Sequence, residues 1–283
     1  MEYKNVIGID LGGTNVRGAV VNEQIRGTIL SKRIHSGGSA DEVLQDLFSF
    51  TDQLIDPSVT AIGIGVPGLV RQQEKMVYDV VYIPSWKKIP LQQLMEDRYR
   101  VPVYAENDAN CFALGEFYFG KGRGVTDLVG VTLGTGLGAG IIVNKRLHPG
   151  RNGGAGEFGM VDYLDHNVEY YTSGQFFRNV HDRDGETVFR EASAGEPSAL
   201  DMYAEFGVHL GNTIKTILYA LDVELIILGG SVRKAWPFFS TAMWKQLQTF
   251  GFPSVIPQIR IEGSDLQNAG ILGAAGLCYN FAE

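Results

Sequence analysis

Two glycine-rich turns carry the residue types that bind phosphate. The first is Asp10-Leu11-Gly12-Gly13-Thr14, at the end of a short apolar run. Glycines lack a Cβ atom, so their backbone N–H groups can approach phosphate oxygens closely. The Thr14 hydroxyl adds a donor, and Asp10 can hold Mg²⁺ directly or through water. The second turn, Gly134-Thr135-Gly136-Leu137-Gly138-Ala139-Gly140, is denser in glycine. Both patterns indicate a phosphate clamp, although a plain hairpin turn would also explain the first.

A candidate base lies in Glu106-Asn107-Asp108-Ala109-Asn110, where a predicted strand becomes a predicted helix. Side chains at such a junction open into a cleft at the carboxyl end of a sheet. Phosphoryl transfer to an alcohol needs a group that positions the hydroxyl. A carboxylate such as Asp108 can also accept the hydroxyl proton. The alternative is that Asp108 only caps the helix, a common task of Asp, and the spacing alone leaves both open.

Two other nucleotide-binding patterns do not fit. The segment Gly63-Ile64-Gly65-Val66-Pro67-Gly68 matches the letters of a dinucleotide-binding turn. Pro67 lies inside it, however, and no acidic residue stands at the distance expected for a ribose contact. The second glycine turn is followed by a predicted strand rather than a helix. No G-K-[ST] sequence occurs, which argues against a Walker A loop.

Apolar periodicity predicts strands that alternate with helices, the pattern of an α/β fold. Predicted strands cover 6–10, 18–21, 31–35, 60–66, 103–106, 128–133, 141–143, 224–228 and 258–262. Predicted helices cover 41–55, 91–99, 108–119, 198–221, 238–247 and the segment from Ala269.

The strand–turn–strand unit occurs twice. When Val6–Val21 is aligned with Leu128–Val143 without a gap, five of the sixteen positions are identical. They are Gly8/Gly130, Leu11/Leu133, Gly12/Gly134, Gly18/Gly140 and Val21/Val143. The repeat predicts a duplicated α/β lobe whose two turns face each other across a cleft and grip one polyphosphate. Chance similarity between two glycine hairpins is the alternative.

Composition narrows the range of partners. The 283 residues suit two α/β lobes better than one core. The net charge of −8 disfavours nucleic acid and anionic lipid as partners. No apolar run approaches the roughly 20 residues that span a bilayer, and the N-terminal stretch lacks the basic start of a signal peptide. Cys111 and Cys278 show no metal-binding spacing, so we expect free thiols in a reducing cytoplasm.

Five motifs in order resemble those of the ROK family (repressors, open reading frames, sugar kinases). They are Asp10–Thr14, Glu106–Asn110, Leu133–Gly140, Gly153–Glu157 and Leu228–Ser231. The resemblance implies a two-lobed, actin-like and hexokinase-like ATPase fold made of duplicated ribonuclease H-like domains. We expect a small lobe of residues 1–107 plus 269–283, a large lobe of residues 108–268, and a homodimer.

The resemblance also assigns roles to matching residues. It implies that Asp108 is the catalytic base and that sugar hydroxyls are bound by Gly68, Asn107, Glu157 and Glu169. It implies phosphate or Mg²⁺ contacts from Asp10, Gly12, Gly13, Thr14, Thr135 and Gly136. The turn Gly229-Gly230-Ser231 matches the one that receives adenosine, and Pro84-Ser85-Trp86 matches a segment near the sugar pocket. Carboxylates and amides suit vicinal hydroxyls because they form paired hydrogen bonds.

The activity that follows from the resemblance is ATP-dependent phosphorylation of the C6 hydroxyl of a hexose. Glucose is the leading acceptor, with N-acetylglucosamine, N-acetylmannosamine, mannose, fructose and allose as alternatives. An alternative function is that of a non-catalytic sugar sensor with the same fold. A repressor would place a DNA-binding domain before the first strand, which here starts near Asn5. A filament-forming or chaperone-like ATPase would not need a base poised for a sugar hydroxyl.

The chain departs from the family in one segment. Most ROK kinases carry a zinc motif of the form Cys-x-Cys-Gly-x-x-Gly-Cys, preceded by a histidine. Here Met160 stands at the histidine position and no cysteine lies between it and Glu169. His166 alone cannot complete a tetrahedral site, so we predict no zinc site. We expect packing by Tyr163, Tyr170 and Tyr171 to hold Glu169 in place.

Overall fold

The computed structural model describes residues 4–281, and its contacts divide them into two compact units. The described part of the first unit comprises residues 4–124, 140–155 and 265–281. The second unit comprises Val125–Ala139 and Gly156–Ser264. The first unit is therefore built from three stretches of chain, and its last stretch returns from the far end of the sequence.

A five-stranded sheet with the order β3-β2-β1-β4-β8 forms the centre of the first unit. Strand β1 (Val6–Leu11) pairs antiparallel with β2 (Asn15–Val21) and parallel with β4 (Ala61–Val66). Strand β8 (Val103–Asn107) lies parallel to β4, and β3 (Ile25–Arg33) forms the opposite edge. The continuous apolar runs of β1 and β4 are typical of central strands covered on both faces.

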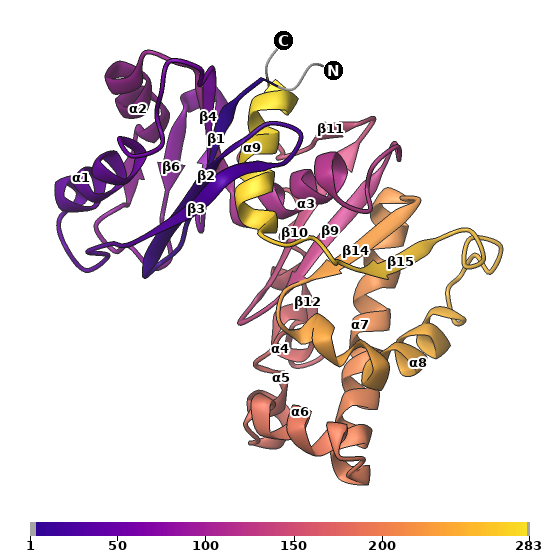
Figure 1. Ribbon diagram of the computed structural model, residues 1–283. Helices are drawn as coiled ribbons and strands as arrows, with labels where there is room; N and C mark the ends of the chain where they lie inside the picture. Colours follow the sequence, from indigo (N-terminus) through magenta and orange to yellow (C-terminus); the bar gives the residue numbers. More distant parts are fainter. Residues whose placement is uncertain (1–3, 282–283) are drawn as a thin grey trace. The chain divides into compact units, whose positions relative to one another are not determined.

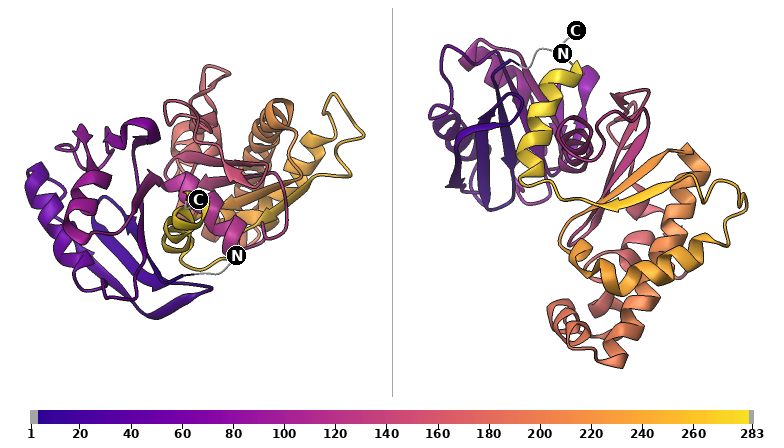
Figure 2. Two further views of the ribbon diagram at one scale, coloured as in Figure 1. Left: turned by 90° about the horizontal axis from the view of Figure 1, so that it is seen from above. Right: turned by 45° about the vertical axis from the view of Figure 1, so that its right-hand side comes forward.

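Helices cover both faces of this sheet (Figures 1 and 2). Helix α1 (Ala40–Thr51) packs Val43, Leu47 and Phe50 into the larger core, together with residues of α2 (Leu91–Tyr99). Helix α9 (Ala269–Phe281) covers the opposite face with a smaller core that includes Ile271 and Ala275. Each helix therefore buries an apolar face against the same strands.

Helix α9 approaches the sheet so closely that several positions accept only glycine. A Cβ atom at Gly8 would lie 2.1 Å from the Ile271 carbonyl oxygen, and one at Gly63 would lie 1.7 Å from that of Ala274. Gly63, the first residue of the segment that resembles a dinucleotide-binding turn, is thus required by helix packing. Helix α3 (Asp108–Phe119) packs closely against α9. A Cβ atom added at Gly273 of α9 would lie 1.7 Å from the carbonyl oxygen of Cys111 in α3.

A second five-stranded sheet repeats the topology of the first. It has the order β11-β10-β9-β14-β15, with β9 (Leu128–Leu133) parallel to β14 (Leu225–Gly229), as β1 is to β4. Strands β9 and β10 (Leu137–Val143) occupy the positions aligned with β1 and β2. The structure therefore confirms the internal repeat, including the turn between its strands. Strands β11 (Arg146–Leu147) and β15 (Arg260–Gly263) form the edges.

Two long helices pack together in the second unit. Helix α7 (Pro197–Leu221) runs against α8 (Trp236–Leu247), and Gly207 and Gly211 allow the close contact. Short helices α4 (Val168–Thr172), α5 (Phe176–His181) and α6 (Gly185–Ser193) precede α7. A two-stranded hairpin, β12 (Asp162–Tyr163) and β13 (His166–Asn167), leads into α4.

The long elements agree with the sequence analysis, and the short ones were missed. The predicted bounds of α2 match those observed, whereas β3 and β10 begin earlier than predicted. Nothing was predicted for the hairpin, for α4–α6, or for the small sheet of β5 (Leu69–Arg71), β6 (Met76–Tyr78) and β7 (Lys88–Ile89). Strands of two or three residues are too short to show a period.

The division by contacts also differs from the expected lobe boundary at Asn107. Helix α3 and residues 140–155 group with the first unit. The physical reason is the packing of α3 on α9, in which Gly115 of α3 also lies against the Ala269 carbonyl. Within residues 4–281, no helix is both long and apolar enough to cross a membrane.

The close α3–α9 contact leads to a test of stability. We expect Gly273→Ala to lower the free energy of unfolding by about 1–3 kcal/mol, because the added methyl group collides with the Cys111 carbonyl. Chemical denaturation monitored by circular dichroism measures the change. Gly37→Ala is the matched control, since no atom lies within 4 Å of its Cβ position. Equal effects of the two substitutions would contradict the packing argument.

Candidate active site

The junction of β8 and α3 presents Asp108 on the surface of the first unit. Asp108 is the first residue of α3 and its side chain is exposed. Asn107 caps the helix, because its Oδ1 accepts a hydrogen bond from the Ala109 amide at 2.9 Å. Its Nδ2 donates to the Gly68 carbonyl at 3.2 Å. The capping bond thus belongs to Asn107, so capping does not explain the presence of a carboxylate at residue 108.

The buried carboxylate of Glu106 holds this junction in place through hydrogen bonds. Glu106 is 0% exposed, and its Oε1 accepts from the Asn107 amide at 2.7 Å and from Asn110 Nδ2 at 3.1 Å. Its Oε2 accepts from Gln72 Nε2 at 2.8 Å. Burial raises the pKa of Glu106, and the hydrogen bonds from Asn107, Gln72 and Asn110 oppose that rise. Sequence reasoning gave Glu106 and Gln72 no role, since nothing in the sequence shows that they meet.

The first glycine turn places Asp10 against the start of α9. Gly12 N–H donates to the Asn15 carbonyl at 3.0 Å and closes the turn. A Cβ atom at Gly270 would lie 2.8 Å from the Asp10 carboxylate, so only glycine leaves room for that carboxylate. Burial raises the pKa of Asp10, while the charge of Arg17, its partner across the β1–β2 ladder, lowers it.

The loop before β7 covers part of this turn. A Cβ atom at Gly13 would lie 2.2 Å from the Cβ of Tyr82, whose side chain is 55% exposed. Trp86 is 0% exposed and packs in the core, where its Nε1 donates to the Ala40 carbonyl at 3.3 Å. Trp86 therefore anchors the loop from inside.

The second glycine turn is held by bonds to its carbonyl oxygens. Gly134 O accepts from the Gly174 amide at 2.7 Å, and Thr135 O accepts from Gln175 Nε2 at 2.8 Å. The N–H groups of Thr135 and Gly136 donate to no protein oxygen within the part of the chain that the structure describes. Such unused donors in a glycine turn can bind an anion.

Glu157 and Glu169 lie close to each other beside the second turn. Burial raises the pKa of Glu157, and the negative charge of Glu169 raises it further. Glu169 Oε2 accepts from the Leu137 amide at 2.8 Å. The structure thus brings together in the second unit the two glutamates that the sequence analysis paired as sugar ligands.

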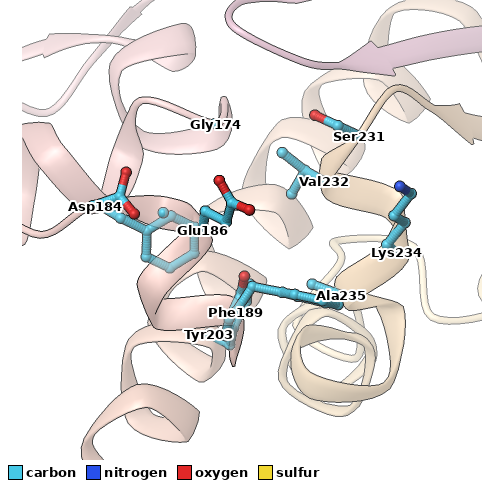
Figure 3. A pocket seen from close by; sticks show the side chains of 11 residues that line it. Gly174, Asp184, Glu186, Phe189, Tyr203, Ser231, Val232, Lys234 and Ala235 are labelled. Atoms are coloured by element: carbon cyan, nitrogen blue, oxygen red, sulfur yellow. The ribbon is translucent and has the colours of Figure 1, made fainter. Parts of the chain in front are cut away.

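A pocket of about 530 Å³ lies in the second unit, next to the second turn (Figure 3). Gly174, which bonds to the turn, contributes to its wall, as does Ser231, which directly follows Gly229-Gly230. Gly230 has a positive φ of 79° and passes close to the Leu133 carbonyl. The apolar wall is made of Phe177, Phe189, Tyr203, Val232 and Ala235, and the polar wall includes Asp184, Glu186 and Lys234. Sequence reasoning did not single out these three charged residues.

The segment that lacks the zinc motif is an aromatic hairpin. The rings of Tyr163 and Tyr171 meet edge to face at 5.5 Å, and His166 stacks on Tyr170 at 3.9 Å. The Tyr163 hydroxyl accepts from Asn212 Nδ2 at 2.9 Å and lies 3.1 Å from His209 Nδ1. The structure confirms that the three tyrosines pack together, and His166 serves as a stacking partner.

Two histidines that the sequence analysis left unassigned share one carboxylate. His181 Nε2 lies 3.1 Å from Glu205 Oε2, and His209 Nε2 lies 3.7 Å from Glu205 Oε1. Burial lowers the pKa of His209, and the negative charge of Glu205 opposes this effect. Neutral His209 can therefore accept a hydrogen bond from Tyr163, which ties the hairpin to α7. Among residues 4–281, no three His, Cys, Asp or Glu side chains are grouped to hold a metal ion.

The predicted site residues fall into two sets. The first unit holds Asp10, Gly12, Gly13, Thr14, Gly68, Asn107 and Asp108. The second unit holds Thr135, Gly136, Glu157, Glu169, Gly229 and Gly230. Each set combines a glycine turn with oxygen-bearing side chains.

Comparison with known proteins assigns this chain to a protein family. The sequence model of the ROK family matches residues 6–280. The chain belongs to the ROK family. It is 31% identical over 261 residues to a glucokinase of Streptomyces coelicolor, an alignment that covers 80% of this chain and 81% of that protein. It is 26% identical over 298 residues to the xylose repressor of Bacillus subtilis, covering 96% of this chain and 76% of the repressor.

A solved ROK structure shares the fold. The ROK glucokinase of Streptomyces griseus, in complex with glucose and AMPPNP, superposes with a TM-score of 0.78 at 27% identity. The match covers 96% of this chain and 98% of the glucokinase. The fold is therefore the α/β, actin-like ATPase fold of ROK sugar kinases, as the sequence motifs imply. ROK proteins include both kinases and repressors among the relatives of this chain.

The Tyr163 hydroxyl provides a test of how the hairpin is held. We expect Tyr163→Phe to lower the free energy of unfolding by about 1–2 kcal/mol, because Asn212 Nδ2 and His209 Nδ1 lose their shared partner. Thermal and urea unfolding measure the loss. Tyr219→Phe is the control, since Tyr219 is 57% exposed and water can replace its bond to Gly251. A Tyr163→Phe protein as stable as the control would show that packing alone holds the hairpin.

Proposed function

We propose that this ROK protein transfers the γ-phosphoryl group of ATP to the C6 hydroxyl of a hexose, with glucose as the leading acceptor. The observation that carries the proposal is the β8–α3 junction. There Asp108 is exposed on the first turn of a helix whose cap is supplied by Asn107. Buried Glu106 holds the same junction through bonds to Asn107, Asn110 and Gln72. A carboxylate held on such a rigid junction suits general-base catalysis.

Asp108 acts as the base in the proposed reaction. It accepts the proton of the sugar hydroxyl as the hydroxyl oxygen forms its bond to the γ-phosphorus. The bond between the γ-phosphorus and the bridging oxygen breaks, and ADP leaves with that electron pair.

Asn107, Gly68, Glu157 and Glu169 are the proposed sugar contacts. Asn107 Nδ2 has a second hydrogen beyond the one given to Gly68, and this hydrogen can be donated to a hydroxyl oxygen. The Gly68 carbonyl contributes by orienting that amide. Glu157 and Glu169 supply carboxylate oxygens that accept from vicinal hydroxyls. Paired polar contacts of this kind discriminate sharply between sugars.

The two turns and the pocket are the proposed ATP site. Backbone N–H groups of Gly13, Thr135 and Gly136, with the Thr14 hydroxyl, suit the phosphates. Gly12 shapes the first turn through the bond from its N–H to the Asn15 carbonyl. The pocket beside Gly229 and Gly230 has the volume and apolar walls that suit an adenine ring. Asp184, Glu186 and Lys234 line the same pocket and offer polar partners to the ribose.

Mg²⁺ fits the residues at the first turn. Asp10 offers a carboxylate at the end of β1, and Mg²⁺ prefers few protein ligands, with phosphate and water oxygens as the remainder. When bound there, the ion would neutralise charge on the transferred phosphoryl group. Gly270 keeps the Asp10 carboxylate in position, and Gly270→Ala would push it away from the turn.

Further parts of the proposal rest on resemblance and composition. We propose a cytoplasmic homodimer with a small-molecule sugar as its partner. The net charge of −8 supports the absence of nucleic acid and membrane partners. A non-catalytic sugar-binding protein is the alternative, in view of the xylose repressor among the relatives.

A coupled assay of ADP release tests the proposed activity. Mg²⁺-ATP is supplied with a panel of glucose, mannose, fructose, allose, N-acetylglucosamine and N-acetylmannosamine. We expect turnover with one or two of these sugars and little turnover without sugar. Sugar binding without ADP release would favour the non-catalytic alternative instead.

Substitution of Asp108 tests the base. We expect Asp108→Ala and Asp108→Asn to lower kcat by about 10²–10⁴-fold, because no group remains to accept the proton. Calorimetric titration with AMPPNP should give an unchanged Kd. Asp201→Asn, a change at an exposed aspartate on α7, is the control for loss of charge. Activity of Asp108→Ala above about a tenth of wild type would exclude this base.

Metal analysis of the purified protein tests the expected absence of zinc. We expect less than stoichiometric zinc by plasma mass spectrometry and unchanged activity after chelation of zinc in the presence of excess Mg²⁺. The aromatic hairpin supports this expectation, since tyrosine and histidine side chains fill the contacts of the segment. One zinc ion per chain would refute it.

A further inference from the structure

The carboxylate of Glu169 is in contact with the second glycine turn itself. Its Oε2 accepts from the Leu137 amide at 2.8 Å, and the Cβ position of Gly136 lies 2.4 Å from the same oxygen. Any side chain at Gly136 would therefore displace Glu169. This carboxylate completes the turn, in addition to facing Glu157.

The segment that carries Glu169 holds the turn at two further points. Gly174 N–H donates to Gly134 O at 2.7 Å, and Gln175 Nε2 donates to Thr135 O at 2.8 Å. Gly174 also forms part of the pocket wall, where Figure 3 shows it across the pocket from Ser231. The stretch from Glu169 to Gln175 thus links the turn to the pocket.

Glu169 is placed by a fixed element and not by a flexible loop. It lies in the first turn of α4, whose cap residue Asn167 accepts from the Tyr170 amide at 2.9 Å. The Tyr170 hydroxyl donates to the Asn179 carbonyl at 2.9 Å, which ties α4 to α5. A change in the position of the Glu169 carboxylate therefore alters its hydrogen bond with the Leu137 amide.

We infer that Glu169 couples the two substrate sites by holding the phosphate-binding turn with one oxygen while it binds a sugar hydroxyl with the other. The inference rests on the proposed function, which assigns the turn to ATP and Glu169 to the sugar. A carboxylate accepts at both oxygens, and Oε1 remains available when Oε2 bonds to Leu137. A sugar that donates to Oε1 and to Glu157 also reduces the repulsion between the two carboxylates.

The consequence is positive coupling between sugar and nucleotide. A sugar bound to Oε1 fixes the carboxylate in the orientation that holds the Leu137 amide, and so favours the turn with its Thr135 and Gly136 donors facing the phosphates. Coupling of binding free energies is reciprocal, so nucleotide must tighten sugar binding by the same factor. Among the residues that the structure describes, the Glu157 carboxylate forms no hydrogen bond with the turn.

Calorimetric titration with AMPPNP and Mg²⁺, with and without saturating glucose, tests the inference in the full chain. In the wild type we expect glucose to tighten AMPPNP binding by about fivefold or more. Glu169→Ala should weaken sugar-free AMPPNP binding by about tenfold, the loss expected for one charge-assisted hydrogen bond, and remove the effect of glucose. Glu169→Gln should keep near-normal sugar-free binding, because its amide oxygen can still accept from Leu137.

Glu157→Ala is the matched control, and we expect it to lose glucose affinity while its sugar-free Kd for AMPPNP stays at the wild-type value. If Glu169→Ala also keeps the wild-type sugar-free Kd, Glu169 does not hold the turn and the inference is overturned. Hydrogen exchange of the Leu137 amide, measured without ligands, separates this result from failure of the proposed function. Faster exchange in Glu169→Ala, but not in Glu157→Ala or Glu169→Gln, supports the inference even if glucose is not the acceptor. Unchanged exchange overturns it.

Discussion

The close approach of α9 to the sheet is the constraint on which the first unit depends. Gly8 and Gly63 allow the backbone of α9 to pack closely on two central strands. Gly273 allows α3 to pack equally closely on α9. Packing at this distance leaves no tolerance for a methyl group. The same helix presents Gly270 to Asp10, so helix packing and the position of a site carboxylate are set together. Because α3 begins at Asp108, the candidate base is also positioned by this contact.

The two halves of the repeat share a backbone plan but obtain their carboxylates differently. In the first copy, Asp10 at the end of β1 supplies the carboxylate beside the turn. Thr132 is the aligned residue in the second copy, and there Glu169 approaches the turn from a separate element. The first turn closes on the Asn15 carbonyl and the second on that of Gly136, one position earlier in the alignment. Duplication thus preserved the donors of each turn while the acidic groups diverged.

The sequence predicted the parts of the molecule that leave a local signal. The period of α2 and the glycine pattern of the two turns identify those elements directly. For Asp108, the sequence left capping and catalysis open, and the capping bond of Asn107 removes the first as an explanation. Contacts between distant residues left no such signal. Gln72 and Glu106 are 34 positions apart, and Leu137 and Glu169 are 32 apart, so only the folded chain shows that they meet.

The discontinuity of the first unit has a consequence for how the chain is made. Strands β1 and β2 leave the ribosome before α9, but the core that covers one face of their sheet needs Ile271, Leu272 and Ala275 of that helix. All of residues 125–264 are translated before that helix, which takes on the order of ten seconds at about 5–20 residues per second. During that interval an apolar face of the nascent sheet is without its helix. Vectorial synthesis therefore leaves this face of the sheet uncovered until residues 269–281 have been translated.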